Sequence, residues 1–162
     1  MGAINAERRD EILVLTIDRP PVNALDVDTL NDLTDVLGKA VWEGDGPVVL
    51  TGTGNVFSAG ADLRRVLDGG PEYIAAGIAA LSQAFEALFV FPRPVVAAVN
   101  GHALAGGCIL TCASDYRVMA DNATIGTVEV RAGVPFPSWA LEIVRFVVPA
   151  HRLQEVVLTG RS

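Results

Sequence analysis

The sequence of 162 residues lacks a long uninterrupted apolar run, although 51% of its residues are hydrophobic. Every stretch of about 18 residues contains a charge, a proline or a glycine, so the pattern predicts no membrane-spanning helix. The first residues, "MGAINAERRDEI", also lack the apolar segment of a secretory signal. We therefore expect a soluble, cytoplasmic protein with no membrane partner, folded as a single domain with a substantial core.

Cysteine and histidine are scarce. The two cysteines, Cys108 and Cys112, stand four residues apart, which is not a usual zinc or redox spacing, and neither His102 nor His151 is near enough in sequence to complete a ligand set. We expect no metal site and interpret both cysteines as small buried apolar residues. His102 has no evident partner and is interpreted as structural.

Basic residues are outnumbered, at 12 Lys and Arg against 19 Asp and Glu, which gives a net charge of −7. Because binding to nucleic acid needs an excess of positive charge, we predict no nucleic-acid partner. Arg64 and Arg65 form an adjacent pair beside a glycine-rich segment. They could contact an anionic ligand or could simply form a solvated helix face.

Hydrophobic periodicity predicts alternating strands and helices. Strands rich in β-branched or small apolar residues are expected at 11–17, 47–51, 94–99 and 115–120. Helices are expected at 26–42, 72–90 and 106–115, followed by two helices separated at Pro149. This alternation predicts an α/β layer fold with parallel strand pairing.

Two glycine-rich segments, "GTGNVFSAGADL" (52–63) and "NGHALAGGCI" (100–109), each lie between a predicted strand and a helix, where α/β folds bind ligands. Neither fits a dinucleotide fingerprint, a phosphate loop or a nucleophile elbow. Two helix-opening turns can instead direct unpaired backbone N–H groups at one oxygen and stabilise an oxyanion. The alternative, glycines that only permit tight turns and close packing, stays open at this point.

The segments "GNVFSAGADL", "PVVAAVNG", "HALAGGC" and "SDYRVMADNATIGTVEVRAGVP" resemble, in order and spacing, the crotonase superfamily, which is the enoyl-CoA hydratase/isomerase family. The resemblance implies a crotonase-like spiral of ββα units over residues 1–162, a homotrimer or dimer of trimers, and an acyl-CoA substrate. It implies no cofactor beyond the coenzyme A of that substrate. Because family members usually continue past "LTGRS" into further C-terminal helices, we expect the C-terminal helical part to be absent here.

The resemblance also implies which residues form the site. The oxyanion hole corresponds to the backbone N–H groups of Ala61 and Gly106. Residues expected to contact the substrate or its coenzyme A are Ala24, Ala59, Gly60, Ala61, Asp62, Leu63, Arg64, Gly106 and Ile109.

Hydratases that resemble this chain use two glutamates, whereas here Ile109 occupies the first position and Glu129 the second. A single carboxylate in an apolar pocket has a raised pKa and can both take and return a proton. This pattern resembles the Δ3,Δ2-enoyl-CoA isomerases, so we expect an enzyme of that type. Hydratase-type activity and a non-catalytic protein that binds coenzyme A stay as alternatives. Arg131, which would lower the pKa of Glu129 if it pointed inward, is expected to be exposed.

Overall fold

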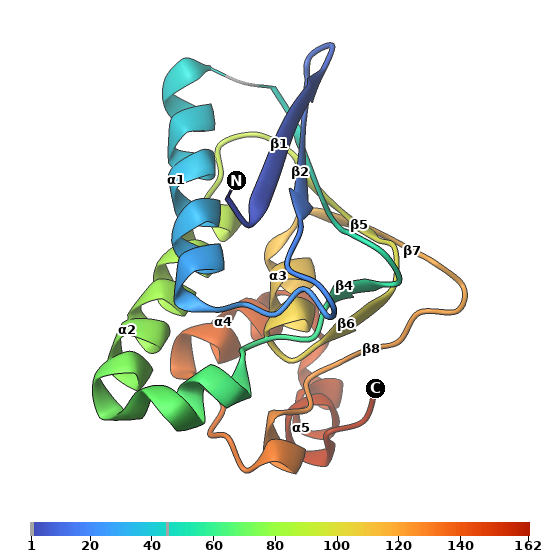
Figure 1. Cartoon of the computed structure of the whole chain (residues 1–162). Coiled ribbons are helices and arrows are strands. Elements are labelled where there is room, and N and C mark those ends of the chain that lie inside the picture. The colour runs from blue at the N-terminus through green and yellow to red at the C-terminus, as the bar shows by residue number, and fades with distance from the viewer. Residues whose placement is uncertain (1, 45) are drawn as a thin grey trace.

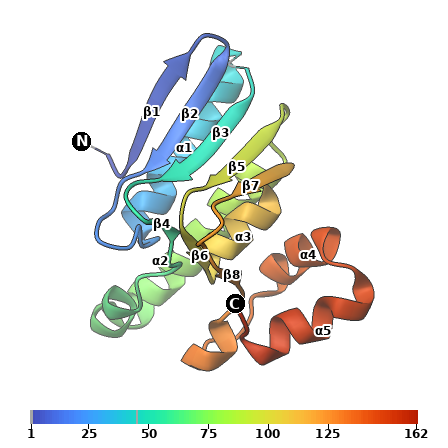
Figure 2. The same ribbon diagram turned by 90° about the vertical axis from the view of Figure 1, so that its right-hand side faces the viewer.

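The computed structural model describes residues 2–44 and 46–162 and contains two mainly parallel sheets (Figures 1 and 2). In the larger sheet the strand order is β1 (Ile4–Arg9), β2 (Ile12–Ile17), β3 (Val48–Gly52), β5 (Val95–Val99) and β7 (Tyr116–Met119). The smaller sheet has the order β4 (Val56–Ser58), β6 (His102–Leu104) and β8 (Ile125–Gly126). Only the β1–β2 pair is antiparallel among the strands described.

The helices are α1 (Val27–Glu43), α2 (Leu63–Phe89), α3 (Gly106–Ala113), α4 (Ser138–Val147) and α5 (Ala150–Thr159), with a 3₁₀ helix η1 (Glu129–Ala132). α1 and α2 pack against each other, and α3 contacts both α2 and α4. Figure 2 shows α4 and α5 at the end of the molecule far from β1. No helix in the two described ranges combines the length and the apolar character needed to cross a bilayer.

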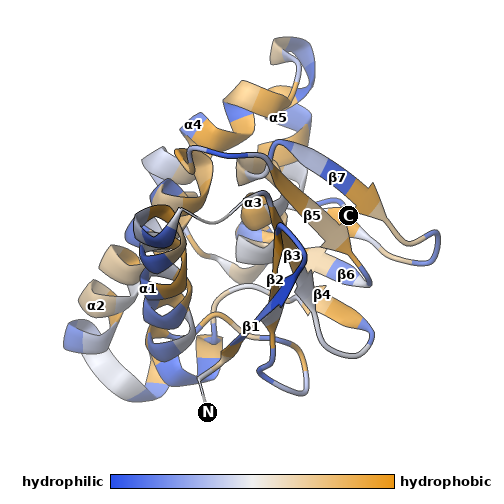
Figure 3. Cartoon of the chain, turned by 90° about the horizontal axis from the view of Figure 1, so that it is seen from above, coloured by the Kyte–Doolittle hydropathy of each residue, from blue (hydrophilic) through white to orange (hydrophobic). Residues whose placement is uncertain are grey.

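Alternating side chains of the parallel strands form the core. Inward residues such as Leu15, Leu50 and Ala97 are fully buried, as expected when one face of a strand packs against helices. Strand β5 is drawn largely in the hydrophobic colour in Figure 3, whereas α1 carries both colours because only one of its sides faces the core. α3 is buried from Gly107 to Ala113. Both cysteines therefore lie in the core, which confirms their interpretation.

The predicted α/β class, the parallel pairing and the two helices divided at Pro149 are confirmed. Strand β1 was not predicted, because five of its six residues are exposed and show no alternation of apolar and polar residues. The helix expected at 72–90 begins earlier, at Leu63. "GGP" interrupts that helix only locally, since Gly70 takes a left-handed φ of 68° and Pro71 starts the next helical stretch.

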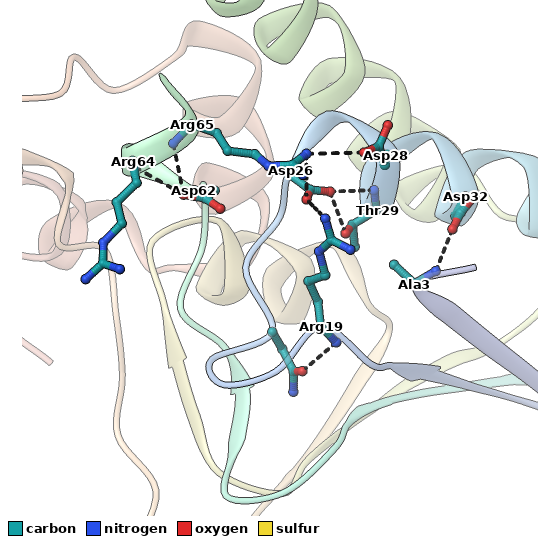
Figure 4. A network of polar contacts seen from close by, with 10 residues as sticks. Ala3, Arg19, Asp26, Asp28, Thr29, Asp32, Asp62, Arg64 and Arg65 are labelled. Atoms are coloured by element: carbon teal, nitrogen blue, oxygen red, sulfur yellow. Dashed lines mark hydrogen bonds and ion pairs between the residues drawn. The ribbon is translucent and has the colours of Figure 1, made fainter. Parts of the chain in front are cut away.

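Asp26 joins three segments at the start of α1 (Figure 4). Its side chain is inaccessible to solvent and accepts hydrogen bonds from the backbone N–H and the hydroxyl of Thr29, both at 2.8 Å. Arg19 and Arg65 form ion pairs with the same carboxylate, Arg65 at 3.1 Å. Burial alone raises the pKa of Asp26, but the hydrogen bonds from Thr29 and Arg19 outweigh it, so this pKa lies below its ordinary value. The ionised carboxylate thus fixes α1 against the beginning of α2.

We predict that Asp26→Asn lowers the free energy of unfolding by about 2 kcal/mol near neutral pH, because it leaves two arginines without their buried partner. A lowered pKa stabilises the fold above the ordinary pKa of aspartate, and this contribution disappears as the pH falls through the pKa of folded Asp26. Urea unfolding should therefore show the two proteins converging in acid.

Asp28→Asn is the matched control, since the Asp28 side chain is 72% exposed and forms an ion pair with Arg65. Its exposed ion pair should contribute less than about 1 kcal/mol. Equal losses in the two variants, or a difference that persists in acid, would contradict this account of Asp26.

Candidate active site

Two turns that open helices lie against each other. Gly60 precedes α2 with a φ of 85°, and Ala105 precedes α3 with a φ of 48°. A Cβ atom placed on Gly60 would stand only 2.8 Å from the backbone nitrogen of Gly106. Within the described residues, neither the Ala61 nor the Gly106 N–H donates a hydrogen bond to the protein. The two turns therefore bring unpaired backbone donors close to each other.

Gly106 and Gly107 lack a side chain for different physical reasons. A Cβ on Gly107 would lie 2.2 Å from the carbonyl oxygen of Ser58, so this position packs directly on strand β4 and excludes a side chain. A Cβ on Gly106 would meet only Leu25 Cδ1 at 3.1 Å and softer contacts beyond it. Gly106 lines a cavity instead. The packing interpretation therefore applies to Gly107, whereas Gly106 leaves the oxyanion interpretation open.

A cavity of about 150 Å³ opens beside both turns. Its walls combine small residues of the turns with the side chains of Ile109 and Glu129 and with two aromatic rings, Phe85 and Trp139. These rings make an edge-to-face contact with centroids 5.3 Å apart. The remaining lining residues are Ala59, Ala61, Leu63, Leu81, Ala105, Gly106, Val128, Ala132, Val134, Pro137 and Ala140. A ligand here would be surrounded almost entirely by apolar groups.

Among the described residues, Glu129 is the only ionisable one in that lining. It belongs to the short helix η1, and its Oε2 atom is buried without a hydrogen-bond partner in the described residues. Burial raises the pKa of Glu129 above its ordinary value, opposed only by a weaker interaction with its own backbone. Such a carboxyl group holds a proton more readily than an exposed one and is able to exchange it with a ligand.

Ile109 lines the same cavity from α3 and is 1% exposed. The position in which the resembling hydratases have an acid therefore faces the site, and it presents an aliphatic side chain. Arg131 points elsewhere: its guanidinium lies 3.5 Å from the carbonyl oxygen of Gly160, and its stem packs on that glycine. As expected, Arg131 is exposed, and it leaves the pKa of Glu129 under the control of burial.

The other predicted residues divide into groups. Ala59 and Leu63 line the cavity, whereas Ala24 is half-buried and precedes Leu25, whose N–H donates a hydrogen bond to the Gly60 carbonyl. Asp62 caps α2 by accepting hydrogen bonds from the backbone N–H groups of Arg64 and Arg65. Figure 4 shows the guanidinium of Arg64 pointing away from the Asp26 network, in contrast to Arg65.

Two lining residues of the cavity were missed by the sequence analysis, and His102 has a structural role. Phe85 and Trp139 were not predicted as site residues, because their helical spacing indicates burial without saying which cavity they line. His102 is exposed on β6, where its Nδ1 contacts the Thr124 hydroxyl at 2.9 Å, which is the structural role expected. No cluster of three or more His, Cys, Asp or Glu side chains suited to a metal occurs in residues 2–44 and 46–162.

Comparison with known proteins gives one consistent family. The family model for enoyl-CoA hydratase/isomerase matches residues 7–162. A carnitinyl-CoA dehydratase from Escherichia coli strain K12 is 34% identical over 168 residues, covering 98% of this chain and 61% of the relative. The chain thus spans about three fifths of the length of the curated relatives it matches.

Comparison with solved structures points to the same family. A probable enoyl-CoA hydratase from Mycobacterium tuberculosis superposes with a TM-score of 0.92 at 31% identity, covering 98% of this chain and 67% of that one. Another structure of the same protein, described as an enoyl-CoA isomerase, gives a TM-score of 0.86 at 32% identity, with 98% and 69% covered. The crotonase-like arrangement of the strands and helices is therefore confirmed.

The burial of Glu129 generates a prediction about stability. Because its pKa is raised on folding, the folded protein binds more protons than the unfolded one as the pH rises from the ordinary pKa of glutamate to that of folded Glu129, and stability falls over that window. The free energy of unfolding of Glu129→Gln should therefore be about 1 kcal/mol higher than that of wild type near neutral pH. This difference should disappear near pH 4. Urea unfolding at both pH values measures the difference, with the exposed Glu72→Gln as control. No gain in stability at neutral pH would contradict the burial penalty.

Proposed function

The chain belongs to the enoyl-CoA hydratase/isomerase family, and on this premise we propose that it moves the double bond of a 3-enoyl-CoA thioester into conjugation, with Glu129 as the single proton shuttle. The observation that supports this choice is the composition of the cavity wall: Glu129 is its only ionisable residue in the part of the chain that the structure describes, and Ile109 stands where a second acid would be needed. The acyl-CoA substrate is part of the proposal, as is the absence of any separate cofactor.

In the proposed reaction the N–H groups of Ala61 and Gly106 hydrogen-bond to the thioester oxygen. Glu129 takes a proton from C2, and the electron pair of that C–H bond moves into a dienolate whose negative charge the two donors stabilise. Glu129 then returns the proton to C4, and the carbonyl re-forms as the double bond settles between C2 and C3. The proton lost at C2 is regained at C4, so no water, oxidant or reductant is consumed.

A second candidate is hydration or the reverse dehydration, favoured by the 34% identity to a carnitinyl-CoA dehydratase. Adding water requires one group to orient and deprotonate the water while the α-carbon receives a proton. One carboxyl group in an apolar wall is less suited to both tasks than to a shuttle between two carbons. The relative described as an enoyl-CoA isomerase gives comparable support to the first candidate.

Assembly and location are likewise proposals. A homotrimer or a dimer of trimers is supported by large apolar side chains at the surface, including Phe146, which is 80% exposed, and Leu158, which is 67% exposed. The acidic composition supports a protein that works without nucleic acid, and a cytoplasmic location suits an acyl-CoA substrate.

The test is a spectroscopic assay that follows formation of the conjugated 2-enoyl thioester from a 3-enoyl-CoA. We expect wild type to convert the substrate and Glu129→Gln to lose at least about 100-fold in rate, with Glu72→Gln unchanged. With deuterium at C2, part of the label should appear at C4, because one sheltered carboxyl group carries it. Formation of a 3-hydroxyacyl-CoA would instead favour hydration. Binding of acyl-CoA without any turnover would favour the non-catalytic alternative.

A further inference from the structure

Trp139 lies between the cavity that contains Glu129 and a groove on the surface. It is the second residue of α4, is half-buried and packs against the core. The groove, of about 420 Å³, runs between α2 and α4, which contact each other and lie side by side in Figure 1. Among the described residues, Trp139 is the only one that lines both the groove and the cavity. It therefore forms the partition between the two spaces.

The two spaces differ in their relation to water. The groove is lined by the polar side chains of Ser82, Glu86 and Glu142, and both of these glutamates are exposed. Such a surface groove is filled by water. The cavity has apolar walls around Glu129, and an apolar cavity of about 150 Å³ can stay free of water. Trp139 thus stands at the boundary between a hydrated space and an apolar one.

Two aromatic pairs join α2 and α4 at this boundary. The inner pair is Phe85 and Trp139, and a Cβ atom placed on Gly106 would stand 3.5 Å from Phe85 Cζ, so this pair lies at the donor turn. The outer pair, Phe89 and Phe146, has ring centroids 5.4 Å apart and lines the groove but not the cavity. The two rings of α2 are four residues apart and those of α4 are seven apart, so each helix presents both rings on one side. Only the inner pair closes the cavity.

We propose that Trp139 is a positioning residue, which closes the cavity against water from the groove and so acts on the reaction through Glu129. This rests on the proposed function, because it takes Glu129 to carry a proton from C2 to C4 while the substrate fills the cavity. Water admitted from the groove would gather at the Glu129 carboxyl group, since the other lining groups are apolar. The carried proton would then exchange with solvent before it reached C4.

Few charged groups face Glu129 from the elements packed around it. On η1 itself, Arg131 turns to the Gly160 carbonyl oxygen. On α3, a hydrogen bond with Cys112 and burial raise the pKa of the Cys108 thiol, which therefore stays neutral. The charged side chains of α2, α4 and α5 around this region are exposed: Glu86, Glu142, Arg145, Arg152 and Glu155. Access of water is therefore the main control on the charge of Glu129.

The first experiment needs no turnover. The ¹³C signals of the glutamate carboxyl groups are followed with pH at an ionic strength of about 0.15 M, which screens the exposed glutamates of the groove, and Glu129→Gln identifies the signal. We expect Trp139→Ala to lower the pKa of Glu129 from its raised value toward the ordinary one, because hydration favours the charged carboxylate. Trp139→Phe should keep most of the raised pKa, since its ring can still face Phe85.

Phe146→Ala is the matched control. It removes an aromatic ring of the same helix from the groove but not from the cavity, so the pKa of Glu129 should stay unchanged. Trp139→Leu takes the place of Trp139→Ala if the latter does not fold, because it keeps an apolar side chain while vacating the indole. An unchanged pKa in the folded Trp139 variant, or an equal fall in Phe146→Ala, would overturn the partition.

The second experiment follows the proton. With deuterium at C2 of a 3-enoyl-CoA, wild type and Phe146→Ala should deliver part of the label to C4. Trp139→Ala should lose most of that label to solvent, because water then reaches the carboxyl group that carries it. Trp139→Phe should restore the transfer. Equal transfer of label in wild type and Trp139→Ala would contradict the role of Trp139.

The two readouts separate this role from the proposed function. A lowered pKa of Glu129 in Trp139→Ala, in a protein whose wild type does not convert 3-enoyl-CoA, would overturn the isomerase function and leave the partition standing. Conversion by wild type, with the pKa and the transfer of label unchanged in Trp139→Ala, would overturn the partition alone.

Discussion

The candidate site depends on the close approach of two backbone turns. Gly60 makes this approach possible, because its φ of 85° is left-handed and any Cβ there would collide with the nitrogen of Gly106. The approach leaves the N–H groups of Ala61 and Gly106 unpaired beside one cavity. Two donors fixed in this way need no rearrangement when charge develops on an oxygen between them. Other residues of the cavity supply the apolar walls around that fixed pair, together with the carboxyl group of Glu129.

Asp26 and Glu129 are both shielded from water, but their surroundings favour opposite charge states. Asp26 is buried, but its hydrogen bonds and arginine partners keep it ionised, and it secures α1 and α2 around the turns. Glu129 is half-buried, and its Oε2 atom is buried without a hydrogen-bond partner among the described residues, which disfavours its charged form. The first arrangement stabilises the fold, whereas the second costs stability and provides a group ready for proton transfer.

Much of the fold could be predicted because its signals are local. The helix from Asp26, the strands at 47–51 and 94–99 and the break at Pro149 follow from periodicity, capping and proline. Strand β1 could not be predicted, since its exposed polar residues pair with β2 through the backbone alone. The start of α2 was also missed, because "GGP" normally ends a helix, whereas here Pro71 begins a second helical stretch directly after Gly70.

The sequence by itself determined the residue types of the site: the glycines of the two turns, the single acid Glu129 and the aliphatic Ile109, whose chemistry does not depend on where they lie. Only the tertiary structure decided which of them meet. It placed Ile109 and Glu129 in the lining of one cavity, turned Arg131 toward Gly160, and gave Gly106 and Gly107 different surroundings. Those outcomes depend on contacts between distant segments, and no local pattern encodes the direction in which a buried side chain points.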